Sequence, residues 1–223
     1  DQLGISQSYI SRLEKRIIDP EHWDRREYFE HFAALDDPFF DITVETDVTR
    51  LYDRAKAGND WFYARYLHAV LRAVNEIEEL RYRIDGQGRI VLFDRIHLSP
   101  TVGREDGTFG FGRFDYAPDY ETFRLGAQRE TDRVQAGTGL MKRSGPMRIN
   151  TIHSTALPWL RFSSLAHPGG RGHRHGIVSM ATGKVENRNG RRTMPLQFSI
   201  HHGFADGRHA GLLFEKIQRY FDE

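Results

Sequence analysis

The feature that most limits the possible folds is a strand, a tight loop and a helix in direct succession near the C-terminus. Residues 194–200 alternate apolar and polar side chains as a half-buried strand does, and residues 208–221 have the apolar spacing of a helix. The loop between them contains His201, His202 and Asp206. Because such a junction can hold an imidazole rigidly within reach of a substrate, we take this loop as the centre of the candidate site.

Bulk properties narrow the class of protein. A chain of 223 residues that is 39% hydrophobic can bury the core of one large domain. The net charge of +1 gives no overall field that would favour nucleic acid or a membrane surface. The absence of cysteine excludes disulfides, thiolate catalysis and cysteine-based zinc sites. We find no apolar run near the ~18 residues of a membrane helix and no secretory signal, so we expect a soluble, cytoplasmic protein.

Hydrophobic periodicity predicts a chain that mixes helices and strands without regular alternation. Helices are expected after Pro20, after Asp47 as far as residue 57, at 61–77, at 119–135 and at 208–221. Strands are expected at 39–48, 80–84, 90–93, 98–114, 151–162, 177–185 and 194–200. This pattern predicts an α/β fold, a two-layer sandwich of a mixed sheet and packed helices, in a single domain.

Residues 1–16 differ in character from the rest of the chain. They resemble the recognition-helix end of a sigma-factor helix-turn-helix, in which Ser6 would cap a helix that carries Ile10, Leu13 and Ile17. The partner helix that such a motif needs is absent, and so half a motif cannot bury its own apolar side. We therefore expect residues 1–17 to be an extension or remnant that does not bind nucleic acid, and residues 18–223 to be the working domain.

The His-His-x-x-x-Asp-Gly pattern of residues 201–207 resembles the signature of the chloramphenicol acetyltransferase family. The resemblance continues, in the family's order, through WDRREYF at 23–29, AVN at 73–75, ELR at 79–81, ALPW at 156–159 and MPL at 194–196. It covers residues 18–222, nearly the whole chain. The related dihydrolipoamide acyltransferases share His-x-x-x-Asp-Gly, but the doubled histidine and the tryptophan-arginine start resemble the antibiotic acetyltransferases. The implied fold is that of the coenzyme A-dependent acyltransferases.

The resemblance implies that His202 is a general base for acetyl transfer from acetyl-CoA to an alcohol, while His201 is structural. Asp206 can be read in two ways: it lies directly against the imidazole, or, as the resemblance implies, it pairs with Arg25 and holds the loop. Thr155 stands where the family has an oxyanion-binding serine, with Ser154 as the fallback donor.

The same resemblance implies the remaining parts of the site and the partners. Ser179 and Trp159 are expected beside acetyl-CoA, which is the co-substrate, and no metal is expected. His31, Phe32 and Phe109 are expected at the acceptor. Chloramphenicol is the default acceptor. The family resemblance also implies a homotrimer with each active site between two subunits.

His31 and Asp36 are polar at positions where the family has apolar side chains. An alcohol other than chloramphenicol therefore stays an alternative acceptor. Two rival functions also remain at this point: a binding module of the same fold that has lost turnover, and a DNA-binding regulator that uses residues 1–16. The His173-x-His175 pair lacks nearby carboxylates and cysteines and does not indicate a metal site.

Overall fold

The computed structural model describes residues 15–140, 148–168 and 175–223, and its centre is a seven-stranded sheet. The strand order is β2-β10-β8-β7-β5-β6, and β9 pairs with β10. The β5–β7 and β7–β8 pairs are parallel, whereas β10 pairs with β2 and β8 in antiparallel fashion, so the predicted mixed sheet is confirmed. The strand bounds are β2 Phe39–Asp47, β5 His97–Gly103, β6 Phe109–Phe111, β7 Thr151–Ala156, β8 Ser179–Thr182, β9 Glu186–Arg188 and β10 Arg191–His201.

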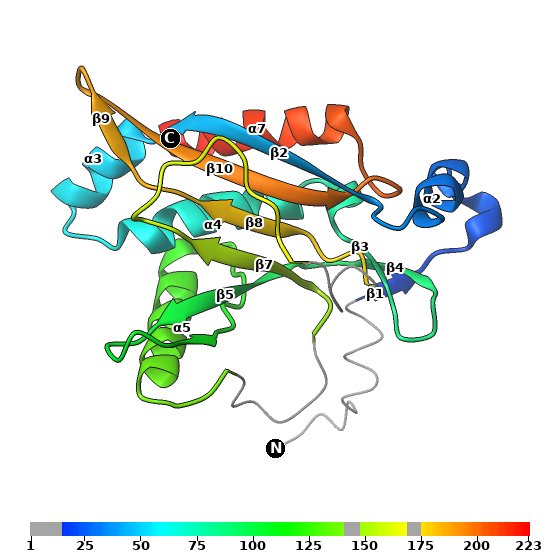
Figure 1. Ribbon diagram of the computed structural model, residues 1–223, viewed down its shortest axis with the longest axis horizontal. Coiled ribbons are helices and arrows are strands. Elements are labelled where there is room, and N and C mark those ends of the chain that lie inside the picture. Colours follow the sequence, from blue (N-terminus) through cyan, green and yellow to red (C-terminus); the bar gives the residue numbers. More distant parts are fainter. Residues whose placement is uncertain (1–14, 141–147, 169–174) are drawn as a thin grey trace.

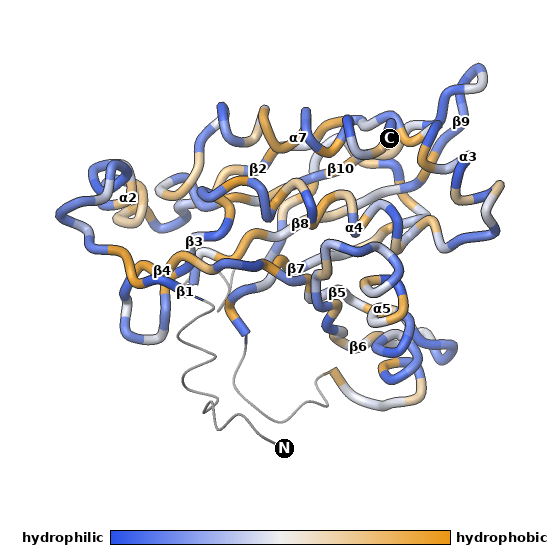
Figure 2. The backbone as a smooth tube through the Cα atoms, turned by 180° about the vertical axis from the view of Figure 1, so that it is seen from behind, coloured by the Kyte–Doolittle hydropathy of each residue, from blue (hydrophilic) through white to orange (hydrophobic). Residues whose placement is uncertain are grey.

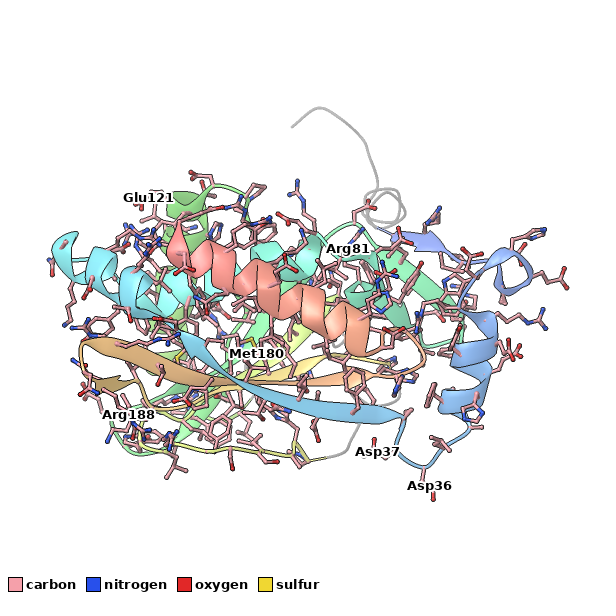
Figure 3. The ribbon with its side chains drawn as sticks, turned by 90° about the horizontal axis from the view of Figure 1, so that it is seen from above. Asp36, Asp37, Arg81, Glu121, Met180 and Arg188 are labelled. Atoms are coloured by element: carbon pink, nitrogen blue, oxygen red, sulfur yellow. The ribbon has the colours of Figure 1, made fainter. Side chains whose placement is uncertain are left out.

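Helices cover one face of this sheet (Figures 1 and 3). They are α3 Thr49–Ala57, α4 Phe62–Asn75, α5 Tyr120–Gln135 and α7 Gly207–Asp222. Leu67 and Leu71 of α4 and Ile217 of α7 are fully buried, as their helical spacing predicts. They share one cluster with the apolar residues of β10, among them Leu196 and Phe198. This cluster is the main core and confirms the two-layer α/β fold.

A smaller sheet packs at the end of the molecule that holds the loop after β10. Its order is β1-β4-β3, with β1 Lys15–Ile17, β4 Ile90–Phe93 and β3 Tyr82–Ile84. Tyr82 and Leu92 form a second buried cluster with Phe204, against which Trp23 and Phe29 pack. The short helices α2 Arg26–Ala33, η1 Pro20–His22 and η2 Glu78–Leu80 complete this end. The small sheet thus supports the loop that comes after β10.

Two expectations need correction and one lies outside the described residues. Ile17 is on β1 and pairs with Val91, so it does not continue a helix, and residues 15–17 join the fold that was expected to begin at residue 18. The strand expected at 151–162 ends at Ala156, since Pro158 has no N–H to donate to a neighbouring strand. The helix-turn-helix expectation for residues 1–14 lies outside the described part of the chain.

The second face of the large sheet is polar. One row of paired residues crosses five strands and consists of Ser99, His153, Ser179, Ser199 and Asp41. The next row consists of Thr155, Ala181, Gln197 and Thr43. Paired residues project to the same side of a sheet, so these side chains share the face that the helices leave uncovered. At the end of the sheet opposite α2, the β9–β10 hairpin extends as a hydrophilic arm (Figures 1 and 2).

Arg83 ties the small sheet to the large one. Its side chain is fully buried, and burial lowers its pKa to about 9. The guanidinium donates to the carbonyls of Ile149 (2.8 Å) and Thr151 (2.9 Å), where β7 begins, and to those of Leu80 and Tyr82 beside β3. A buried cation is tolerated here because carbonyl dipoles surround it.

Replacing Arg83 by methionine will leave these carbonyls without a donor. We expect Arg83→Met to lower the free energy of unfolding by about 2–4 kcal/mol, measured by urea denaturation. The matched control is Arg89→Met, because Arg89 is half exposed and pairs with Asp85 at the turn. Its loss should cost less than about 1 kcal/mol. Equal losses in the two variants would show that the carbonyl contacts of Arg83 contribute nothing specific.

Candidate active site

The ring of His202 is held at the point where β10 ends. Its backbone N–H donates to the carbonyl of Pro38 (2.7 Å). The imidazole stacks on Phe32 with ring centroids 3.9 Å apart and planes 5° apart, and Phe40 packs against it at 4.9 Å. Its Nδ1 is buried without a hydrogen-bond partner among the described residues. The chain therefore fixes the ring firmly but leaves its polar contacts incomplete.

The neighbouring His201 has a different environment. It is 2% exposed, and its Nδ1 accepts a hydrogen bond from the N–H of Gly203 (3.1 Å). Its ring packs between Phe29 and Phe204, at 5.7 and 4.7 Å. A Cβ on Gly203 would come within 2.9 Å of the Phe29 Cα, so only glycine allows helix α2 to approach this closely. His201 thus belongs to the packed base of the loop.

Asp206 contacts Arg25 across the loop. Nη1 of Arg25 donates to Oδ2 of Asp206 (3.2 Å), and its Nε donates to the carbonyl of Gly203 (3.4 Å). Oδ1 of Asp206 accepts from the Arg208 N–H and lies 2.9 Å from Nδ1 of His209. Burial raises the pKa of Asp206, but the charge of His209 and the hydrogen bonds from Arg25 and Arg208 outweigh burial and lower it overall. The carboxylate therefore serves the loop and the start of α7, and we find no contact between it and the His202 ring in the described structure.

Thr155 lies on the uncovered face of β7, far from His202. It pairs with Ala181, which pairs with Gln197 on β10, five residues before His202. Usual strand geometry then separates the two positions by about 10 Å across the sheet and about 16 Å along it. In Figure 1, β10 ends beside α2 whereas β7 runs the opposite way. One chain does not bring this hydroxyl and this imidazole together.

Ser154, the fallback donor, projects to the other side of the sheet. It is in register with Met180, and it is buried on the helix-covered face. A hydroxyl there cannot reach the polar face that carries Thr155. Ser154 is therefore not an alternative to Thr155 at this site.

The other predicted residues are spread over several surfaces. Ser179 begins β8 on the polar face, next to His153. Trp159 is 77% exposed, so it is not a core residue. Phe109 is 46% exposed on the edge strand β6. His31 is exposed on α2 with its ring against Phe32 (5.0 Å).

Asp36 lies in the exposed loop between α2 and β2, near the His202 end of the molecule (Figure 3). Among the residues predicted at the acceptor and at acetyl-CoA, only Phe32 contacts the His202 ring in the described structure. In the His173-x-His175 pair, Nδ1 of His175 lies 2.6 Å from the Ile84 carbonyl oxygen, and His173 lies outside the described residues.

Two histidines that the motifs did not indicate lie on the same polar face as Thr155. His153 is two residues before Thr155 on β7, and burial, the charge of Arg83 and His167 lower its pKa to about 4. His167 lies over the sheet with its Nε2 2.8 Å from Oε1 of Gln197. The sequence signal for His153 is its two-residue spacing from Thr155, because residues i and i+2 of a strand project to the same face.

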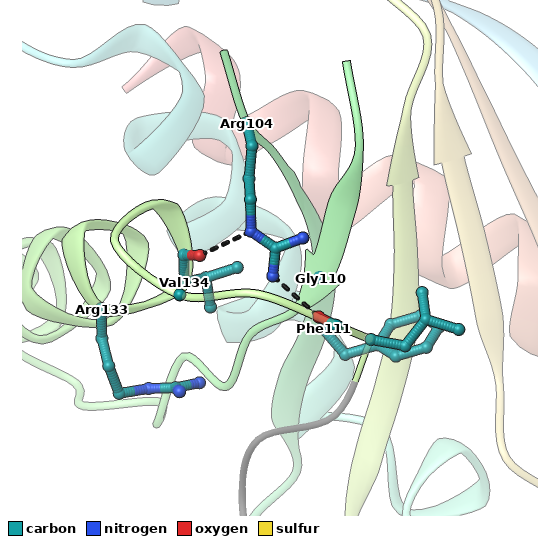
Figure 4. A pocket seen from close by; sticks show the side chains of 8 residues that line it. Arg104, Gly110, Phe111, Arg133 and Val134 are labelled. Atoms are coloured by element: carbon teal, nitrogen blue, oxygen red, sulfur yellow. Dashed lines mark hydrogen bonds between the residues drawn. The ribbon is translucent and has the colours of Figure 1, made fainter. Parts of the chain in front are cut away.

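Two of the surface recesses among the described residues differ in character. One of about 520 Å³ opens on the polar face between β2, β10 and residues 161–163, and Arg161 there pairs with Glu45. The other is small and lies beside α5 (Figure 4), where Arg104 donates to the carbonyls of Val134 (2.9 Å) and Gly139 (2.8 Å). The guanidinium of Arg104 is thus already bound to backbone, and that of Arg133, which also lines this recess, pairs with Glu130.

A mixed sheet with helices on one face and a fixed histidine between its strand and final helix defines a coenzyme A-dependent acyltransferase fold. A solved chloramphenicol acetyltransferase superposes with a TM-score of 0.86 and 36% identity, over 93% of this chain and 99% of that one. A probable dihydrolipoamide acetyltransferase from Listeria monocytogenes superposes with a TM-score of 0.66 at 16% identity, over 100% of this chain and 94% of that one, and so supports the fold alone.

Sequence comparison gives the family. The model of the chloramphenicol acetyltransferase family matches residues 13–218. The chloramphenicol acetyltransferase of Vibrio anguillarum is 27% identical over 208 residues, which cover 92% of this chain and 94% of that protein. The Escherichia coli enzyme of the same name is 27% identical over 95% of this chain and 98% of its own length. The chain belongs to the chloramphenicol acetyltransferase family and is an O-acetyltransferase.

Among the described residues no helix has the length and apolar character needed to span a membrane.

The lowered pKa of His153 predicts how stability depends on pH. An imidazole in the unfolded chain takes up a proton near pH 6.5, whereas that of folded His153 does so only near pH 4. As the pH falls through this window, protons therefore bind preferentially to the unfolded state, and the free energy of unfolding decreases. At pH 7 both forms are neutral and the group contributes nothing.

We expect His153→Phe to remove this part of the pH dependence. From pH 7 to pH 4, the native protein should lose up to about 3 kcal/mol more stability than the variant. Urea titrations at several pH values measure the difference, and groups common to both proteins cancel. Parallel curves for the two proteins would show that His153 titrates normally in the folded state.

Proposed function

We propose that the protein transfers the acetyl group of acetyl-CoA to a hydroxyl of an alcohol, with chloramphenicol as the default acceptor and His202 as the general base. The observation that carries this proposal is the fixed His202 ring, stacked on Phe32, with a buried nitrogen that has no partner among the described residues. A ring held in one orientation suits proton transfer, because the base must already point at the proton that it removes.

The reaction balances with a single base. His202 removes the acceptor's hydroxyl proton while the oxygen attacks the thioester carbonyl carbon, and the carbonyl electrons move onto its oxygen. The tetrahedral intermediate then collapses, the C–S bond breaks, and the imidazolium returns its proton to the departing sulfur. Such direct transfer involves no covalent acetyl-enzyme, and one neutral imidazole contributes roughly 10²–10⁴ in rate.

The Thr155 hydroxyl is proposed to donate a hydrogen bond to the thioester carbonyl oxygen, which becomes negatively charged during the attack. One fixed donor of this kind contributes about 3 kcal/mol to transition-state stabilisation. The β-methyl group restricts the χ1 rotamers of Thr155, and this restriction helps to hold the hydroxyl in one direction on the strand. Ser179 and Trp159 are proposed to lie along acetyl-CoA, and His31, Phe32 and Phe109 to lie at the acceptor.

The site is proposed to form between subunits of a homotrimer. The pairing register separates Thr155 from His202 within one chain, and an adjacent copy would supply the missing half. The Arg25–Asp206 pair is proposed to keep the His202 loop in shape from within its own subunit. Residues 18–223, together with the paired residues 15–17, are proposed as the catalytic domain.

Turnover is tested by thiol release from acetyl-CoA with and without chloramphenicol, on the native protein and His202→Ala. We expect chloramphenicol-dependent release that His202→Ala reduces by roughly 10²- to 10⁴-fold, because the base is removed. Unfolding curves of the variant provide the control for folding. A folded His202→Ala protein with native turnover would contradict the proposed base.

The shared site is tested by mixing two inactive variants. His202→Ala keeps Thr155, and Thr155→Val keeps His202, so co-refolded mixtures should contain complete sites made from two chains. In a random mixture about one quarter of the sites are complete, and activity should recover to about that fraction. Mixing without refolding is the control. Failure of refolded, oligomeric mixtures to recover any activity would contradict a site between subunits.

A further inference from the structure

His209 lies in the first turn of α7, directly after the loop that carries His202. Its imidazole is 17% exposed and has a carboxylate beside each ring nitrogen. Nδ1 lies 2.9 Å from Oδ1 of Asp206 and 3.2 Å from the backbone nitrogen of the same residue. Nε2 lies 3.4 Å from Oε1 of Glu79. One side chain thus joins the residue that precedes α7 to the short helix η2.

The ring of His209 can contact both neighbours in its neutral and in its cationic form. In the neutral form with the proton on Nε2, Nδ1 accepts from the N–H of Asp206 while Nε2–H faces Glu79. In the cationic form, Nδ1–H donates to the Asp206 carboxylate and Nε2–H again faces Glu79. The link between Asp206 and Glu79 therefore does not depend on which of these two forms is present.

Glu79 lies on a segment that is itself firmly held. The next residue, Leu80, is 1% exposed and belongs to the main core. The Leu80 carbonyl accepts from Nη1 of the fully buried Arg83 (3.0 Å), whose Nη2 donates to the Thr151 carbonyl of β7. A carboxylate on such a segment is a suitable anchor for His209, because its backbone is already ordered and only side-chain freedom is lost when it pairs.

The contacts of His209 extend to His202 through Asp206 and Arg25. Oδ2 of Asp206 accepts from Nη1 of Arg25, and Nε of Arg25 donates to the carbonyl of Gly203, the residue that follows His202. Nη2 of Arg25 is buried without a hydrogen-bond partner among the described residues. The hydrogen bonds that orient this guanidinium in the described structure are therefore those to Asp206 and Gly203, and a displaced Asp206 carboxylate would move Arg25 and the peptide beside His202.

We propose that His209 is a positioning residue for acetyl transfer: it ties Asp206 to Glu79 of η2 and thereby, through Arg25, keeps the His202 ring in its productive orientation. This inference rests on the proposed role of His202 as the base. His209 touches no substrate in this role. A misplacement of about 1 Å at a reacting group can reduce a rate by about 10²-fold, so a small shift passed along these contacts is enough to be measured.

Two substitutions break the link from opposite ends. His209→Asn keeps a polar atom near the position of Nδ1 and can still contact Asp206 at the start of α7, but it has no atom where Nε2 lies and so ends short of Glu79. Glu79→Ala removes the carboxylate, whereas Glu79→Gln keeps an acceptor oxygen. Glu215→Ala is the matched control, because Glu215 is an exposed carboxylate on α7 itself.

We expect His209→Asn and Glu79→Ala each to lower kcat by about 5- to 20-fold and to change KM for acetyl-CoA and chloramphenicol by less than about twofold, because the base is misaligned while the substrate contacts remain. The double variant should be no slower than either single variant, because both remove the same link. Glu79→Gln should recover most of the rate, and Glu215→Ala should leave it unchanged. An unchanged kcat in both single variants, or losses that multiply in the double variant, would overturn the proposal.

A spectroscopic measurement separates failure of this inference from failure of the proposed function. The ring resonances of His202, identified by their absence from His202→Ala, are compared among the native protein and the variants, and urea unfolding curves show that each variant is folded. Resonances that move in His209→Asn and Glu79→Ala but not in Glu215→Ala support the positioning role even if the native protein transfers no acetyl group. If acetyl is transferred and the His202 resonances stay at their native positions in both variants, the proposal is wrong and the acetyltransferase function stands.

Discussion

The pairing of β10 on both of its edges is the constraint on which the structure depends. This strand is bonded to β2 over nine residue pairs and to β8 over four, and its apolar side chains enter the helix-covered core. The apolar core fixes the register, because a slip of one residue would move Leu196 and Phe198 to the polar face and bring Gln197 and Ser199 into the core. The histidine loop is attached directly to the end of β10, and it is consequently placed with little freedom.

The loop is closed by contacts from segments that are distant in sequence. Arg25 reaches Asp206 and the Gly203 carbonyl, and Phe29 packs where glycine leaves room. Tyr82 and Leu92 of the small sheet pack against Phe204. The N-terminal fifth of the chain therefore exists in part to close a loop near the C-terminus, and this explains why the motif WDRREYF and the motif HHGFADG occur together.

Sequence periodicity predicted the elements that have one clear apolar side. The 62–75 helix, β2 and the hairpin around Asp85 appear as expected, since burial of one face leaves a pattern of period 3.6 or 2. Residues 15–17 and 157–162 were misread, because a three-residue strand has no measurable period and a proline after a strand permits several continuations. Motifs likewise led to His202 but not to His153, which depends on pairing between strands that are distant in sequence.

The two consecutive histidines have opposite environments for a simple geometric reason. Successive residues at a strand end face opposite ways, so the ring of His201 enters the aromatic packing and the ring of His202 turns out against Phe32. Inserting or deleting one residue within β10 would exchange the two roles without changing either side chain. The phase of a strand, rather than the chemistry of an imidazole, thus decides which of the two rings enters the aromatic packing.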